Sequence, residues 1–226
     1  MSAPATARDQ VSVFDVTPRR VGGVDLAPVP SWKRAFDVFA SAAGLAALSP
    51  LLVIIAIAII IESPGPPLFR QLRVGQGGKT FTIWKFRSMR LGAERLLADL
   101  ADQNEASGRI FKMKNDPRRT RVGAFLRKTS LDELPQLWNI LKGDMSCIGP
   151  RPPTTYEVAE YEDHEMARLA ARPGVTGLWQ VPKRGDHNFH DMVTLDVEYA
   201  ERLSLSLDAS ILLRTIPTII RGRGSY

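Results

Sequence analysis

The chain of 226 residues carries 30 Lys and Arg against 24 Asp and Glu, for a formal charge of +6, and 44% of its residues are apolar. This is long enough for one ordinary domain with additions, and apolar enough to bury a core. Cys147 is the only cysteine, which excludes an internal disulfide and favours a reducing compartment.

The first predicted elements are a tail and a membrane helix. Residues 1–30 are rich in Pro, Ala, Val and small polar residues and lack the charged-then-apolar order of a secretory signal, so they predict a flexible tail. Residues 31–62 predict a membrane element. Within it, 27 residues from Ala35 to Ile61 hold one charge, Asp37. That length crosses a hydrocarbon core of roughly 30 Å as a helix.

The pair Ser49-Pro50 lies near the middle of this apolar stretch. A proline there removes a backbone hydrogen bond and kinks the helix, and the serine hydroxyl can satisfy the freed carbonyl. The helix therefore either spans the bilayer with a tilt or bends and returns to the side it entered. Basic residues flank both ends of the segment, at Lys33, Arg34, Arg70 and Arg73. Positive charge marks the cytoplasmic side, which favours re-entry, but these residues alone leave both geometries open.

Residues 63–226 predict a cytoplasmic domain of the α+β class, mostly helical, with a small β-hairpin. The hairpin is expected from strands at 68–74 and 80–86 joined by a glycine-rich turn. Helices are predicted over 91–103, 120–127, 132–141, 155–171, 191–202 and 207–221, with an irregular loop at 147–154 and a loop with a short strand at 172–181. The last helix mixes Ile and Arg, so it either lies in the membrane interface or packs against the core.

Positive charge is concentrated between Arg109 and Lys128, where eight basic residues face Asp116 and give a local charge of +7. This exceeds the total for the chain, so an anion is expected near the segment. Phosphorylated small molecules, anionic lipid head groups and nucleic acid all fit that expectation.

Two acids, Asp132 and Glu133, stand side by side just after this basic segment. One interpretation is helix capping, because Ser130 and Glu133 have capping-box spacing. The other starts from the neighbouring Arg127 and Arg151: a carboxylate held ionised among guanidinium groups acts as a nucleophile or a metal ligand. That set suits phosphoryl transfer, with Mg²⁺ offsetting the charge of a diphosphate and arginines binding its oxygens. One acid would then be the nucleophile, and its neighbour would help hold the metal or orient the first.

Two further signals are weaker. Lys85 and Arg87 alternate on one strand face, which is either solvated or directed at a substrate. His187 and His190 lie in a turn-like segment between two aspartates, and we do not assign them a metal site.

Four stretches of the sequence carry a family resemblance: "PLFRQLRVGQGGKTFTIWKFRSM", "KNDPRRTRVGAFLRKTSLDELPQLWNILKGDMSCIGPRP", "RPGVTGLWQV" and the terminal "RTIPTIIRGRGSY". Together they resemble the bacterial sugar transferase family, the monotopic phosphoglycosyl transferases that load polyprenyl phosphate with a sugar phosphate. The resemblance covers about residue 32 to the end, in family order.

The resemblance implies an enzyme of the bacterial inner membrane with its catalytic domain, residues 63–226, on the cytoplasmic face. Such enzymes transfer hexose-1-phosphate from a UDP-sugar to polyprenyl (undecaprenyl) phosphate, releasing UMP, with Mg²⁺ as cofactor, in exopolysaccharide or other glycoconjugate assembly. Carried over by position, Asp132 is the nucleophile that forms a phosphosugar-enzyme intermediate, with Mg²⁺ near it, and Glu133 is its partner.

Other positions follow from the same resemblance. Arg127 and Arg151 match basic positions around the phosphates, and Lys85 and Arg87 are placed in the site. Ser49-Pro50 matches the helix-breaking pair, which implies a monotopic protein with a re-entrant helix.

One departure concerns Arg184. After "GLWQV" this chain has "PKRG" in place of an Asn-Gly-Arg or Ser-Gly-Arg turn, so the nucleotide-contacting role of Arg184 stays open. The sugar, with glucose or galactose favoured, and a homodimer are open as well.

The alternative function from a different class is a membrane-tethered basic module that docks anionic lipid or nucleic acid, whereas the transferase needs no nucleic acid. A docking module should tolerate Asp132→Asn, and the transferase should not.

Overall fold

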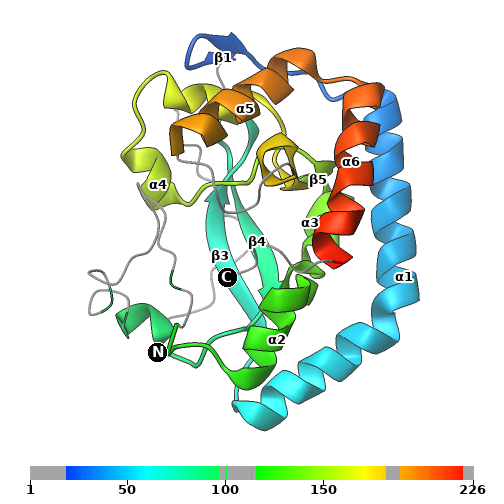
Figure 1. Cartoon of the computed structure of the whole chain (residues 1–226), viewed down its shortest axis with the longest axis vertical. Coiled ribbons are helices and arrows are strands. Elements are labelled where there is room, and N and C mark those ends of the chain that lie inside the picture. Colours follow the sequence, from blue (N-terminus) through cyan, green and yellow to red (C-terminus); the bar gives the residue numbers. More distant parts are fainter. Residues whose placement is uncertain (1–18, 97–99, 101–112, 114–115, 182–188, 221–226) are drawn as a thin grey trace.

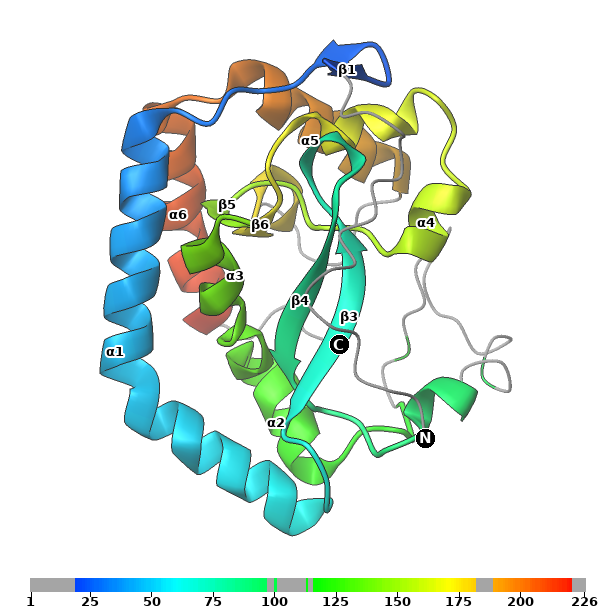
Figure 2. The ribbon, with the colours of Figure 1, turned by 180° about the vertical axis from the view of Figure 1, so that it is seen from behind.

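The structure is a computed structural model, and it describes residues 19–96, 100, 113, 116–181 and 189–220. A long β-hairpin runs through the middle of the molecule, and the long helix α1 runs along one side of it (Figure 1). Seen from behind, α3 and α6 lie between α1 and the hairpin, and α5 crosses the end near β1 (Figure 2). The predicted class, mostly helical with small sheets, is confirmed.

Helix α1 (Ser31–Glu62) is one continuous helix of 32 residues with Pro50 inside it, and Figure 1 shows it bent into two arms. Pro50 has no N–H to give to the carbonyl of Ala46, and the Ser49 hydroxyl donates to that oxygen instead, at 2.9 Å. The predicted break is therefore confirmed as a bend within an unbroken helix. By length and composition α1 is apolar enough to cross a membrane.

The two arms of α1 bury side chains of different kinds, polar in the first arm and apolar in the second. The first arm buries Lys33, Asp37 and Ser41, which recur every four residues and so form one polar stripe. The second arm buries Ile55 and Ile59 in an apolar cluster with residues of β4 and α2. The first arm is thus fastened by polar contacts and the second by apolar packing.

The predicted hairpin is confirmed in its position. Strands β3 (Leu68–Val74) and β4 (Thr80–Phe86) pair antiparallel along their whole length, and Gly77 and Gly78 take the positive φ angles of the turn, 66° and 79°. At the last residue of β3, the Val74 N–H donates to the carbonyl of Pro153 at 2.9 Å. This contact brings the 152–154 segment against the hairpin.

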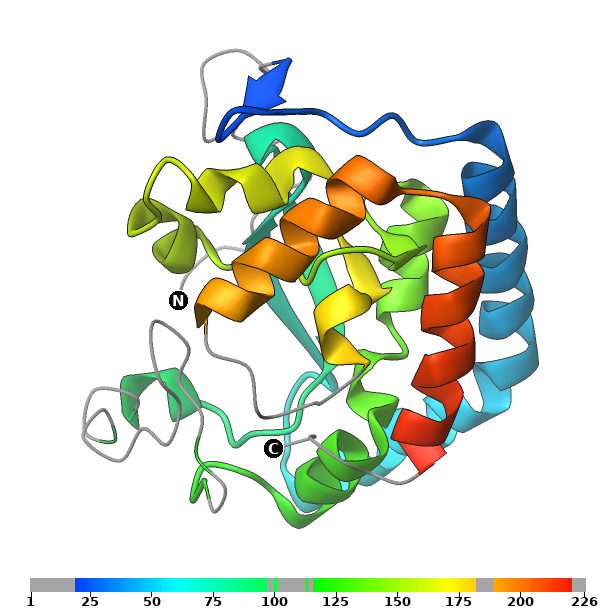
Figure 3. The same ribbon diagram turned by 45° about the horizontal axis from the view of Figure 1, so that its top comes forward.

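Most of the other helices lie close to where the sequence predicts them. Thr120 caps α2 (Arg121–Thr129) by accepting from the Gly123 N–H. The last two helices of the described residues are α5 (Phe189–Arg202) and α6 (Leu205–Ile220), which Figure 3 shows in orange and red. Of the helix predicted over 91–103, the described part is the 3₁₀ helix η2 (Ala93–Leu96). Helix α6 buries Ile211 and leaves Leu213 and Ile216 exposed, so it packs against the core and also presents an apolar face.

Two predictions between residues 147 and 171 are wrong. The surface helix expected over 155–171 is α4 (Thr155–Ala159) followed by the 3₁₀ helix η5 (Glu165–Ala170), because the carboxylate of Glu165 accepts the N–H of Glu162 and turns the chain. Much of η5 is buried. The expected loop at 147–154 begins instead as strand β5 (Ser146–Ile148), which pairs in parallel with β6 (Gly174–Thr176) ahead of the 3₁₀ helix η6 (Leu178–Gln180).

The prediction of a flexible tail over 1–30 does not hold for residues 19–30. They contain the two-residue strands β1 (Arg20–Val21) and β2 (Val24–Asp25), paired antiparallel. The Ala27 N–H donates to the carbonyl of Ala170 at 2.9 Å, and Ala27 joins the largest core cluster beside Tyr199 and Ile211. Burial of these apolar side chains holds the segment against α5 and α6.

Candidate active site

Asp132 and Glu133 lie in the 3₁₀ helix η4 (Leu131–Glu133), between α2 and α3 (Gln136–Lys142). The helix predicted over 132–141 therefore begins later than expected. Ser130 closes α2 in a left-handed conformation with φ of 58° and makes no side-chain cap bond to η4, so the capping-box interpretation is wrong. The sharp turn at Ser130 directs the two acids toward the hairpin.

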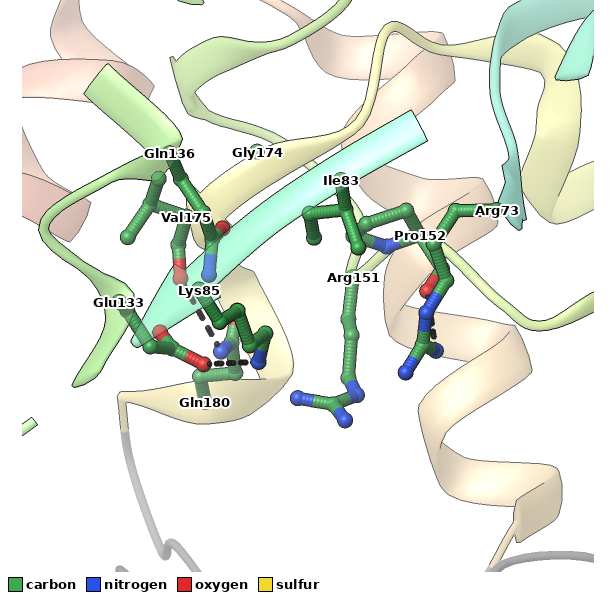
Figure 4. Close-up of a pocket in the computed structure, with 10 residues that line it drawn as sticks. All are labelled: Arg73, Ile83, Lys85, Glu133, Gln136, Arg151, Pro152, Gly174, Val175 and Gln180. Carbon is green, nitrogen blue, oxygen red and sulfur yellow. Dashed lines mark hydrogen bonds and ion pairs between the residues drawn. The ribbon is translucent and has the colours of Figure 1, made fainter. Parts of the chain in front are cut away.

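Lys85 of β4 meets Glu133 across a small pocket. Its Nζ lies 2.8 Å from Glu133 Oε1, and both side chains are largely shielded from solvent (Figure 4). Burial lowers the pKa of Lys85, and the charge of Glu133 opposes that change. This pair brings a strand residue and the acidic turn together, as the substrate-facing interpretation of Lys85 expects.

Arg87, the residue directly after the end of β4, does not line this pocket. Its guanidinium donates to the carbonyls of Ser63 and Pro64, directly after α1, and its side chain is buried. The solvated interpretation of Arg87 is therefore wrong, and its contacts join the end of α1 to the hairpin.

Asp132 is 8% exposed, and burial raises its pKa to about 6. The charge of Glu133 adds to this rise, while Lys85 and Arg127 oppose it. The sequence leads us to expect a carboxylate held strongly ionised by cations, but desolvation outweighs them. With a pKa of about 6, Asp132 is mostly ionised at pH 7 and is more basic than a free aspartate.

Two arginines of the sequence prediction lie around the acids. Arg127, in the last turn of α2, donates from Nε to the Ser88 hydroxyl at 2.9 Å. Burial lowers the pKa of Arg127, and the charge of Asp132 acts against this. Arg151 lines the same pocket as Lys85 and Glu133. Arg184 lies outside the described residues.

Arg73, whose position in the sequence indicated only a charge flanking the membrane helix, also lies at this pocket. It lines the pocket beside Arg151, donates from Nη1 to the carbonyl of Pro152 at 3.0 Å, and is 7% exposed. Burial and the neighbouring charge of Arg151 lower its pKa to about 10. Figure 4 shows the side chains of Arg73 and Arg151 extending in the same direction, an arrangement that suits an anion bound between their guanidinium groups. Gln136 and Gln180 also line the pocket and were not predicted.

A magnesium ion fits the donor set of this site. Mg²⁺ is usually held by one or two carboxylates and completes its octahedron with water and substrate phosphate oxygens. The charge of Glu133 acts on Asp132, which shows that two carboxylates stand close together. Within the described ranges no group of three or more His, Cys, Asp or Glu side chains could hold a metal, so substrate oxygens would have to supply the other ligands.

Taken together, the acids, the cations around them and the apolar helix α1 define a class of protein that sets a carboxylate pair among cations beside an apolar surface. Such a site suits a phosphate-bearing ligand. The comparison with known families narrows this class. A profile described as bacterial sugar transferase matches residues 29–222, and the chain belongs to that family.

Relatives in the family carry informative names. The chain is 43% identical over 199 residues to the undecaprenyl-phosphate galactose phosphotransferase of Salmonella typhimurium, with 86% of this chain covered but only 41% of the relative. It is 43% identical over 205 residues to the UDP-glucose:undecaprenyl-phosphate glucose-1-phosphate transferase of Caulobacter vibrioides, covering 86% of this chain and 72% of the relative. It is 39% identical over 212 residues to the exopolysaccharide production protein ExoY of Sinorhizobium fredii, covering 92% and 91%. The chain thus spans less than half of the Salmonella relative and nearly all of ExoY.

Proposed function

We propose that the protein is a phosphoglycosyl transferase that moves hexose-1-phosphate from a UDP-sugar to undecaprenyl phosphate and releases UMP. The observation that carries this proposal is the placement of Asp132, which is buried beside Glu133 and within the influence of Lys85 and Arg127, while Glu133 and Lys85 line a pocket with further guanidinium groups. The names of the Salmonella and Caulobacter relatives support the same transfer, and that of ExoY supports a place in exopolysaccharide production.

The reaction proceeds in two displacements at one phosphorus atom. An Asp132 carboxylate oxygen attacks the β-phosphorus of the UDP-sugar, and the bond from that phosphorus to the oxygen bridging it to the α-phosphorus breaks. UMP leaves with the bonding electron pair, and a phosphosugar-aspartyl anhydride remains. A phosphate oxygen of undecaprenyl phosphate then attacks the same phosphorus, which forms the lipid diphosphate sugar and restores the Asp132 carboxylate.

The residues around Asp132 divide the remaining tasks. Arg73 and Arg151 bind the phosphate oxygens of the donor, so that negative charge developing on the leaving UMP is offset. Lys85 holds Glu133 by the 2.8 Å contact and so reduces its repulsion of Asp132. Asp132, with Glu133 beside it, would hold Mg²⁺, which would further neutralise the charge of the diphosphate.

The membrane arrangement belongs to the same proposal. We place α1 as a re-entrant helix in the bacterial inner membrane, with the catalytic domain on the cytoplasmic face. The bend at Pro50 supports re-entry, and so do basic residues on both sides of the apolar stretch, Arg34 before it and Arg70 after it, since positive charge favours the cytoplasmic side. The apolar side chains that α1 leaves exposed include Phe39, at 75%, and Ile61, at 78%. Lipid would cover them.

The decisive experiment follows the first displacement without lipid acceptor. Purified protein is incubated with a UDP-sugar labelled in the β-phosphate, and the label on the protein is located by mass spectrometry. We expect label on Asp132, and none in Asp132→Asn, whose UMP release should fall by about 10³-fold or more. Asp25→Asn is the matched control, because Asp25 is an exposed carboxylate of β2.

Two outcomes contradict the proposal in different ways. Near-normal UMP release by Asp132→Asn rejects Asp132 as the nucleophile. Normal turnover by the unaltered protein without any trapped label favours direct attack by the lipid phosphate. A screen of UMP release across UDP-sugars, with undecaprenyl phosphate and Mg²⁺, identifies the sugar, and removal of Mg²⁺ by EDTA tests the cofactor.

A further inference from the structure

An apolar groove opens on the inner side of the bend in α1. It has a volume of about 420 Å³, and every side chain that lines it is apolar. Helix α1 contributes Leu52, Val53 and Ala56, the hairpin contributes Trp84 and Phe86, and Trp138 of α3 completes the wall. Nothing in the catalytic pocket described above accounts for an apolar groove of this size.

The groove and the catalytic pocket share a strand. Successive side chains of a β-strand point to opposite faces, so Ile83 and Lys85 of β4 line the pocket, while Trp84 and Phe86 line the groove. The two sites also meet at the end of η4, because Glu133 lines the pocket and Pro135, two residues later, lines the groove. A ligand in the groove therefore lies close to the catalytic acids.

The rim of the groove carries positive charge. The guanidinium of Arg70 lies over the ring of Trp84, 4.3 Å from its centroid, and Arg70 pairs with Trp84 across the hairpin. Next along the hairpin, Phe86 lies in one apolar cluster with the second arm of α1 and with Leu131 and Leu134, which flank the two acids. The groove is thus apolar along its length, reaches the residues that flank the acids and has a cation on its rim, a profile that suits a long hydrocarbon chain ending in a phosphate.

We propose that this groove binds the isoprene units nearest the phosphate of the polyprenyl phosphate acceptor and directs that phosphate toward Asp132. This inference rests on the proposed function, since it assigns a place to the second substrate of that reaction. The donor is held by charged groups in the pocket, whereas the acceptor needs an apolar surface that ends at the acids. A groove across the strand from Lys85 meets that need and keeps the two substrates on separate paths.

The test narrows the groove without altering the catalytic pocket. Val53→Trp places a large side chain in the groove, and Val53 is 58% exposed, so the core is little disturbed. Ala56→Phe is a second variant that fills the groove from the next turn. Ile54→Trp is the matched control, because Ile54 is 62% exposed and does not line the groove.

The two displacements are measured separately on each variant in detergent. We expect labelling of the protein by the UDP-sugar and the KM for the UDP-sugar to stay unchanged in all three. The KM for undecaprenyl phosphate should rise about tenfold in Val53→Trp and Ala56→Phe, the change expected when roughly two methylene groups of the acceptor lose their contact with protein. It should stay unchanged in Ile54→Trp. An unchanged acceptor KM in both groove variants overturns the inference while leaving the proposed function intact, whereas loss of labelling in the unaltered protein counts against the proposed function itself.

A photolabelling experiment on the unaltered protein tests the identity of the occupant. The probe is a polyprenyl phosphate with a diazirine on the isoprene unit next to the phosphate. We expect crosslinks to Trp84, Pro135 or Trp138, suppressed by excess undecaprenyl phosphate and not by phosphatidylglycerol. Equal suppression by phosphatidylglycerol, or equal labelling of Ile54 on the other side of α1, would show a surface for ordinary lipid chains and overturn the proposal.

Discussion

Replacing Lys33 by methionine tests how the first arm of α1 is fastened to the catalytic domain. The Lys33 ammonium meets Asp208 Oδ2 at the start of α6, with the two side chains 2% and 5% exposed. The Tyr199 hydroxyl donates to the other oxygen of Asp208 at 2.8 Å. In Lys33→Met the Asp208 carboxylate stays buried and loses its cation, while its bond from Tyr199 remains.

Removing one partner of a buried ion pair costs about 3–5 kcal/mol, because an uncompensated charge is left in a medium of low dielectric constant. Since the Tyr199 hydroxyl still satisfies one oxygen, we expect the lower end, about 3 kcal/mol. For a chain of this length each kcal/mol shifts the melting temperature by roughly 2–4 °C, so the expected fall is about 6–12 °C.

The assay is thermal unfolding in detergent, followed by circular dichroism, with a double variant and a matched control. Lys33→Met/Asp208→Leu removes both charges and should regain most of the lost stability, since replacing a whole buried pair by apolar groups is often nearly neutral. Lys142→Met removes a lysine whose pair with Asp144 is 47% exposed on the lysine side, and should change little. The reasoning is refuted if Lys33→Met melts within 2 °C of the unaltered protein, or if the double variant melts no higher than the single one.

Three further outcomes are expected. Glu62 accepts the first two N–H groups of α2 at 2.7 and 2.8 Å, and Glu62→Gln should cost about 1 kcal/mol at pH 7 in a chemical denaturation series. Because these bonds lower the pKa of Glu62 from its usual 4.5, this contribution is present above pH 4.5 and lost as the pH falls below it, so the two proteins should converge at low pH. Burial and the charge of Asp37 raise the pKa of Cys147 to about 12, so iodoacetamide should alkylate it at pH 8 about 10³-fold more slowly in the native protein than in urea, and equal rates would contradict this. Pro50→Leu restores the N–H that Pro50 lacks, so α1 should straighten and span the membrane. A tail cysteine (Ser2→Cys, with Cys147→Ser) should react only from the cytoplasmic side in the protein with Pro50, and from outside cells in Pro50→Leu. Unchanged labelling would contradict this account of the bend.

The parts of the fold that the sequence predicts are those that local interactions determine. The hairpin at 68–86 alternates over two seven-residue strands around a glycine turn, and α5 and α6 lie within two residues of their predicted starts. Strands β1, β2, β5 and β6 have two or three residues each, too few for alternation to be visible. Strands β5 and β6 form because a distant segment supplies each partner, as when the Ser146 N–H donates to the Pro173 carbonyl at 2.8 Å. Strands β1 and β2 pair with each other across Gly22 and Gly23.

In the candidate site too, the sequence predicts the residues marked by a local pattern and misses those that distant contacts place. Asp132 and Glu133 are recognisable from their spacing within a basic segment, and strand alternation marks Lys85 and Arg87 as neighbours on one face. Alternation could not predict that Lys85 and Arg87 have different partners. The Arg87 guanidinium donates to the carbonyls of the segment after α1, and the position of that segment depends on the bend in α1, which is distant in the sequence. Arg73 was missed as a ligand for a similar reason, since it reaches the pocket through the Pro152 carbonyl, 79 residues further along the chain.

The protonation of Asp132 depends on the balance between solvent and charge around it. The cations near Asp132 in the sequence favour its ionised form, and in the structure Lys85 and Arg127 do lower its pKa. Burial acts in the opposite direction and is the larger effect, since the turn at Ser130 removes the carboxylate from water and sets Glu133 beside it. A nucleophile has to be ionised at neutral pH and still basic enough to bond to phosphorus, and a pKa of about 6 satisfies both conditions. The cations keep the carboxylate ionised and the fold makes it more basic, so the chemistry proposed for Asp132 requires that both act on it together.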